Sequence, residues 1–123
     1  MQDERAPGAL GYAGFWPVYL AAHRRRATRL WHFAGTAAGL LCLLAAALSW
    51  DWWPLAAAPF AGYLPAWISH FMIEGNRPAT FGHPLWSFAS DFRMLGLWLA
   101  GRLDGELARH GIADAGQAPV RRA

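Results

Sequence analysis

The sequence predicts an all-α integral membrane protein, built on an antiparallel transmembrane helical hairpin flanked by two further helices. Two apolar segments, residues 32–50 and 54–73, are separated only by a short polar break around Asp51. If both segments are helices, so short a break forces them to run antiparallel. The chain has only 123 residues but is 55% hydrophobic, with 8 Trp and 7 Phe. A soluble domain of this size has too little interior to bury so many large side chains.

The ends of the chain are expected to contribute little structure. Residues 1–10 are polar and contain Pro and Gly, which predicts a disordered N-terminus without the apolar core of a cleavable signal peptide. Residues 110–123 predict a disordered tail in the same way. We therefore expect a single helical membrane domain over residues 11–109.

A short first helix is expected from Phe15 or Trp16 to about Arg25. Pro17 would then occupy the first turn, where its missing N–H costs nothing. This helix is too short to cross a bilayer, so we expect it to lie in the membrane interface.

The second helix is expected over residues 29–50, with Thr28 as its N-cap. Its length approaches the roughly 20 residues that span a hydrocarbon core. Cys42 is the one cysteine of the chain and lies inside this apolar run. The chain therefore has no disulfide framework, and the thiol is expected to pack among apolar side chains without reacting.

The third helix is expected over residues 55–74 and to end at Gly75. It contains Pro59 and Pro65, which predict a kink between residues 61 and 65.

The last helix is expected over residues 85–109, opening on Pro84. It is apolar through Trp98 but contains Asp91 and Arg93, which we expect to form structural ion pairs. The sequence leaves open whether this helix spans the membrane.

The basic residues predict the orientation of the hairpin. All 11 are arginine, and four of them precede the hairpin: Arg24, Arg25, Arg26 and Arg29. Arg77 follows the hairpin, whereas its turn offers only Asp51. The positive-inside rule therefore places the open end in the cytoplasm. The Ala, Gly and Arg bias without Lys resembles a GC-rich bacterial genome, so the membrane is expected to be a bacterial inner membrane. The arginines form no stripe with interleaved polar residues, so nucleic-acid binding is not expected.

Two histidines lie at the open end of this hairpin. With the turn near Trp52, His32 lies 20 residues before it and His70 lies 18 after it. At a rise of 1.5 Å per residue, their depths differ by only about 3 Å. Glu74 follows His70 by one helical turn and shares its face. Ionisable groups at such depth are costly without a use, so we expect a functional site here.

Two motifs resemble a known family. The spacing of His23, Thr28 and His32, followed by Gly35, is joined by a second motif, "AWISHFMIEGNRPATFGHPLWSFASDFRM". Together they resemble a small membrane-protein family long catalogued as a domain of unknown function. Its characterised fungal member is an iron(II)-dependent 2-hydroxypalmitate dioxygenase. The resemblance covers residues 15–103 and favours the family's bacterial branch, with Thr28 standing where the family usually has Asn.

The resemblance implies a membrane enzyme that shortens a 2-hydroxy fatty acid by one carbon with molecular oxygen. It also implies that His23, His32 and His70 hold Fe(2+). Non-haem iron oxygenases combine imidazoles, often with one carboxylate, and leave positions open for oxygen and substrate. Glu74 could complete the ligand set, or orient a ligand imidazole without touching the metal. Substrate binding is assigned to Arg77, as a bidentate donor to the carboxylate, and to Asn76.

Two other functions stay open at this point. One is a b-type haem protein with His32 and His70 as axial ligands. The other is a non-catalytic membrane scaffold in which the histidines merely satisfy hydrogen bonds. His83 is expected to be a loop or capping residue, and His110 is expected to have no part in the site. The sequence leaves open whether the protein forms a homo-oligomer.

Overall fold

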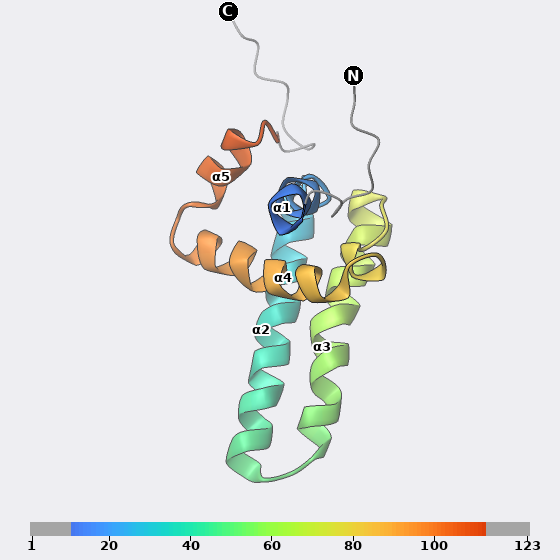
Figure 1. Cartoon of the computed structure of the whole chain (residues 1–123). Helices are drawn as coiled ribbons and strands as arrows, with labels where there is room; N and C mark the ends of the chain where they lie inside the picture. Colours follow the sequence, from blue (N-terminus) through green and yellow to red (C-terminus); the bar gives the residue numbers. More distant parts are fainter. Residues whose placement is uncertain (1–10, 113–123) are drawn as a thin grey trace, which may run out of the picture. The chain divides into compact units, whose positions relative to one another are not determined.

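The computed structural model describes residues 11–112, in which all regular secondary structure is helical and no strand is present (Figure 1). This confirms the all-α class. The expectations for residues 1–10 and 113–123 lie outside the described residues. The elements are, in order, α1 (Tyr12–Ala21), α2 (Arg26–Ser49), α3 (Trp53–Ser69), the π-helix η1 (His70–Glu74), the 3₁₀-helix η2 (Ala79–Phe81), α4 (Pro84–Leu99) and α5 (Leu103–Arg109).

The chain forms two compact units. Residues 25–78 make the hairpin unit, which contains α2, α3 and η1. The remaining residues make the flanking unit, in which the structure describes α1, η2, α4 and α5.

In the hairpin unit, α2 and α3 run antiparallel and pack along their length, as predicted (Figure 1). Trp50 takes a left-handed conformation with φ 60°, and its N–H bonds to the Ala46 carbonyl at 3.0 Å. This conformation ends α2, so that the chain can reverse before Trp53.

Glycines allow α2 and α3 to approach closely. A Cβ on Gly35 would lie 2.7 Å from the Gly62 carbonyl oxygen and 3.2 Å from Pro65. One turn further along α2, a Cβ on Gly39 would lie 3.3 Å from the Ala58 carbonyl oxygen. The two backbones are therefore near contact at this level, one turn from His32.

Among the described residues, α2 is the one helix long and apolar enough to cross a membrane, judged by length and composition alone. It has 24 residues, whereas α3 has 17 before the π-helix begins. The all-helical hairpin is thus present, and its insertion into a membrane stays a prediction.

Several predicted helix boundaries were wrong. The first helix begins at Tyr12 and ends at Ala21, so Pro17 lies in its interior rather than in its first turn. The helix starts directly after Gly11, because the φ of 75° at this glycine is not helical. The second helix begins at Arg26 with Arg25 as N-cap, so Thr28 is not its cap. Thr28 instead uses its hydroxyl in a long-range hydrogen bond, which competes with local capping.

The third and last helices also differ from the expected ranges. The third begins at Trp53 and changes to a π-helix at His70. The last is divided into α4 and α5 because Gly101, with φ 71°, takes a left-handed conformation between them.

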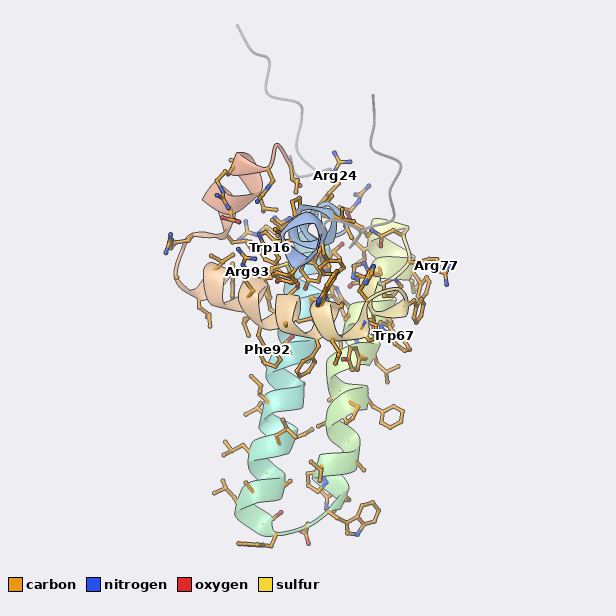
Figure 2. All side chains as sticks on the ribbon, in the orientation of Figure 1. Trp16, Arg24, Trp67, Arg77, Phe92 and Arg93 are labelled. Carbon is orange, nitrogen blue, oxygen red and sulfur yellow. The ribbon has the colours of Figure 1, made fainter. Side chains whose placement is uncertain are left out.

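In the flanking unit, α1 packs on α4 and is also tied to α5. Trp16 donates its indole N–H to Glu106 Oε1 at 2.8 Å, and the Arg93 guanidinium lies 4.0 Å from the centre of a Trp16 ring (Figure 2). The bonds from Trp16 and then Arg109 lower the pKa of Glu106 to about 2. Tyr19 donates its hydroxyl to Asp91 at 2.5 Å. Asp91 and Arg93 thus make contacts that the sequence did not predict.

Replacing Gly35 with Ala should destabilise the hairpin. The added methyl would overlap a backbone oxygen, which cannot move unless the helices separate. Overpacking of this kind costs about 1–3 kcal/mol, measurable as a lower midpoint of thermal unfolding followed by circular dichroism. The control is Gly96→Ala, at an exposed site in α4 with no atom within 4 Å of the added Cβ. It should be neutral or stabilising by up to about 1 kcal/mol. Equal stability of the two variants would contradict the close helix contact.

Candidate metal centre

The hairpin brings His32 and His70 together, as the depth argument predicted. Their ring centroids lie 5.9 Å apart with the planes at 86°, and one ring nitrogen of each lies within 4.8 Å of the other. Both side chains are buried, with 5% and 1% of their surface exposed. Two nitrogens at this distance can bind one metal ion, since metal–imidazole bonds are about 2 Å long.

His70 is held by Asn76. Its Nδ1 lies 2.8 Å from Asn76 Oδ1. A carbonyl oxygen only accepts, so Nδ1 carries the proton and the neutral ring has its lone pair on Nε2. Nε2 is therefore the atom that is available to a metal, since a metal binds the neutral form of an imidazole.

The π-helix explains how Asn76 reaches His70. The N–H groups of Gly75 and Asn76 both bond to the His70 carbonyl, at 2.8 and 2.9 Å. Gly75 has φ 77°, a conformation that other residues rarely adopt. The chain therefore turns back at Gly75, as the sequence predicted, and carries Asn76 to the His70 ring. Such widened turns are frequent at functional sites.

Glu74 joins η1 to the beginning of α2. Its Oε2 accepts from the Thr28 hydroxyl at 2.6 Å and from the Arg25 backbone N–H at 3.1 Å. The carboxylate thus accepts the N–H of the N-cap residue, as the acidic residue of a capping box does, and lies at the positive end of the helix dipole. Sequence analysis missed this contact. The sequence did contain a signal for this contact, since an acidic residue at the end of one hairpin helix lies opposite the N-terminus of the other.

His23 lies in the flanking unit, just after the end of α1, and is 1% exposed. Its Nδ1 lies 2.7 Å from the Tyr19 carbonyl oxygen, so Nδ1 again carries the proton and Nε2 the lone pair. Its ring also packs on the Tyr19 ring, with the centroids 4.3 Å apart. Membership of His23 in a ligand set stays a prediction.

The other residues predicted at or near the site have different environments. Arg77 is exposed in the loop after η1 (Figure 2). His83 is at the N-cap position of α4 and stacks on Trp86, with centroids 5.1 Å apart. His110 follows α5 and contacts Glu106. The substrate roles of Arg77 and Asn76 stay predictions.

The donor set fits a transition metal. Two of the three predicted ligands, His23 and His70, have Nδ1 engaged by an oxygen acceptor, the arrangement that orients metal-binding imidazoles in proteins. Imidazole suits zinc, copper, iron and nickel alike. The side chains therefore support a metal site without selecting the metal.

Residues 10–103 match the protein family described as 2-hydroxy-palmitic acid dioxygenase Mpo1-like. The chain belongs to this family. Membership confirms the resemblance seen in the sequence, and the family name gives a dioxygenase-like activity on a fatty acid. The matched range contains His23, His32 and His70 and ends before His110. No curated protein and no solved structure matches the chain.

The bond between Thr28 and Glu74 should be measurable by a double-mutant cycle. Thr28→Val removes the hydroxyl but keeps the shape, and Glu74→Ala removes the acceptor. A hydrogen bond to a charged group contributes about 1.5–3 kcal/mol, so chemical unfolding should give a coupling energy between the two changes of about 1–3 kcal/mol. Thr36→Val is the matched control, because the Thr36 hydroxyl bonds only within α2, to the His32 carbonyl at 3.1 Å. Its effect should add to that of Glu74→Ala. If the free-energy changes of the single variants simply added in both cycles, the bond between Thr28 and Glu74 would not contribute to the stability of the hairpin.

Proposed function

We propose that this protein is an iron(II)-dependent dioxygenase that shortens 2-hydroxy fatty acids, or a related lipid, by one carbon. The observation that carries the proposal is the buried pair His32 and His70 in a chain of the 2-hydroxy-palmitic acid dioxygenase Mpo1-like family. The bond to Asn76 orients the ring of His70 for metal binding.

His23 is the proposed third ligand, and the covalent chain supports this. The backbone N–H of Arg25 is bonded to Glu74, which follows His70 by four residues. Only Arg24 lies between Arg25 and His23. Consecutive Cα atoms are 3.8 Å apart, so the His23 Cα lies within about 8 Å of the Arg25 Cα. The length of the chain therefore allows His23 to reach the end of the hairpin where His70 lies.

Bound iron(II) would supply the one-electron chemistry that dioxygen needs to react with an organic acid. The substrate's carboxylate and 2-hydroxyl form a chelating pair, and the plain acid lacks the hydroxyl. The balanced reaction converts RCH(OH)COOH and dioxygen to RCOOH, carbon dioxide and water. Imidazole ligands carry no negative charge, so bound iron(II) would keep its full positive charge to attract the substrate carboxylate.

Three further residues are assigned roles in this proposal. Arg77 is the candidate donor to the substrate carboxylate, since a guanidinium forms two parallel hydrogen bonds to it. Asn76 holds His70 through its oxygen, and its amide nitrogen supplies donors for the substrate. Glu74 is assigned the joining of η1 to α2 rather than iron binding, because Oε2 accepts two hydrogen bonds from α2 and its N-cap and Glu74 is not among the close-lying candidate ligands.

The haem alternative fits the hairpin unit poorly. A porphyrin between His32 and His70 would extend several ångströms on every side of the iron. One turn from His32, however, α2 and α3 are almost in backbone contact at Gly35 and Gly62. The helices would have to separate to admit the ring.

The proposed site lies at a membrane surface. The part of the hairpin near its turn exposes large apolar side chains, including Leu48 at 74% and Trp50 at 93%. Tryptophans at 50, 52 and 53 suit the interface between lipid and water. We therefore propose that the hairpin spans a bacterial inner membrane, with its histidine end at the cytoplasmic face. There a fatty acid can present its head group while its tail stays in lipid.

Membrane topology should follow the arginines. Single cysteines at positions 26 and 77, in a Cys42→Ala background, should react with an impermeant maleimide only after the cytoplasmic side is opened. A cysteine at position 51 should react in intact spheroplasts. Opposite accessibility of positions 26 and 77 would rule out the membrane hairpin.

Replacing the proposed ligands should remove the metal. His23→Ala, His32→Ala and His70→Ala should each lose most of the iron found in wild-type protein purified anaerobically, since the remaining ligands form a weaker site. His110→Ala is the control and should keep it. Metal analysis measures the iron, and a Soret band would reveal haem instead. Full iron content in all three variants would refute the ligand assignment.

The reaction itself is tested by product chain length. With iron(II) and oxygen, a long-chain 2-hydroxy acid should give the fatty acid one carbon shorter, detected by mass spectrometry. The plain acid should react at least 10-fold more slowly because it cannot close the chelate. Chelator-treated protein and His70→Ala are the controls. If no iron-dependent product formed from any of several chain lengths, a non-catalytic scaffold would be the better account.

A further inference from the structure

Tyr19 contacts His23 in two ways. Its backbone carbonyl accepts the His23 Nδ1–H at 2.7 Å, and its ring packs against the imidazole with the centroids 4.3 Å apart and the planes at 34°. The first contact fixes which nitrogen carries the proton, and the second restricts rotation of the ring. Both depend on where Tyr19 itself lies.

Tyr19 is in turn held by Asp91 of α4. The Tyr19 hydroxyl donates to Asp91 Oδ1 at 2.5 Å, at the short end of the range for such hydrogen bonds. Tyr19 is 1% exposed and Asp91 is 8% exposed, so little water competes for this bond.

We propose that Asp91 and Tyr19 form a positioning chain for His23, in which Asp91 fixes Tyr19 and Tyr19 fixes the orientation and the protonated nitrogen of the imidazole. The inference rests on the proposed function in one respect, since it takes His23 as a metal ligand. It adds two positioning residues that do not touch the metal. Partners that hydrogen-bond a ligand imidazole directly change metal affinity by roughly 10–100-fold, and the Tyr19 hydroxyl and Asp91 act one contact further out, so we expect the lower end of this range.

The same two helices offer a matched control. Tyr12 of α1 and Ser90 of α4 also share a hydroxyl hydrogen bond, at 2.9 Å. Tyr12→Phe thus removes a tyrosine bond between α1 and α4 without touching Tyr19 or His23. A purely structural role for the Tyr19 bond predicts similar effects of Tyr12→Phe and Tyr19→Phe. A positioning role predicts an effect on the metal site from Tyr19→Phe alone.

The experiment uses the full chain and measures iron(II) affinity by chelator competition and the visible spectrum of the cobalt(II) form, which reports ligand geometry. Tyr19→Phe and Asp91→Leu should each weaken iron(II) binding about 10-fold or more and shift the cobalt bands. Asp91→Asn retains an oxygen acceptor and should restore most of the affinity. Tyr12→Phe should match the wild type. Unfolding midpoints of all variants show which of them fold.

A metal-free measurement separates this inference from the proposed function. In the ¹⁵N spectrum of the apo-protein, His23 should be the Nδ1–H tautomer, and Tyr19→Phe should convert it to a mixture. If the wild type bound no metal but showed this tautomer change, the proposed function would fail and the positioning chain would stand. If the wild type bound iron and Tyr19→Phe matched Tyr12→Phe in affinity, cobalt spectrum and tautomer, the positioning chain would be overturned while the proposed function stood.

Discussion

The hydrogen bonds from Thr28 and Arg25 to the carboxylate of Glu74 close the open end of the hairpin. A two-helix hairpin is fixed at its turn, but its free ends can diverge unless another interaction joins them. Glu74 joins the end of η1 to the first turn of α2, and His32 and His70 lie within one or two turns of this contact. The carboxylate also satisfies a backbone N–H that would otherwise lack a helical partner. The spacing of the histidine pair therefore depends on it.

Gly35 acts from the other side of the histidine pair. Its lack of a side chain lets α2 and α3 come into near backbone contact one turn from His32. The pair is thus bracketed by a hydrogen-bonded tie at Glu74 and a close helix contact at Gly35. Two buried rings held between such contacts have little freedom to separate, which is the condition for binding a small ion with short bonds.

The sequence predicted the meeting of His32 and His70 because helical rise is constant and depth follows from counting residues. It did not predict the partner of Thr28, because local rules read a threonine before an apolar run as an N-cap. That hydroxyl instead bonds Glu74, 46 residues away. The division of the last helix was missed for a simpler reason. The expected range of residues 85–109 runs through Gly101, whose backbone allows the left-handed conformation that separates α4 from α5.

The contacts of Asn76 and Tyr19 could not be predicted from spacing either. Asn76 reaches His70 only because the π-helix and Gly75 turn the chain back. The bond from Tyr19 to Asp91 joins helices 72 residues apart in sequence. Periodicity identifies the faces of helices, but it does not give the pairing of side chains between them.

The energetics of these hydrogen bonds bear on the choice between a metal site and a scaffold. Replacing both partners of a buried hydrogen bond by apolar groups of the same shape is often nearly neutral for stability. Stability alone therefore gives no reason to bury imidazoles at positions 23 and 70. In each ring the oxygen acceptor places a proton on Nδ1, so a neutral ring has its lone pair on Nε2. That arrangement has a clear use when Nε2 binds a metal, and this is the physical reason to favour a metal site over the scaffold.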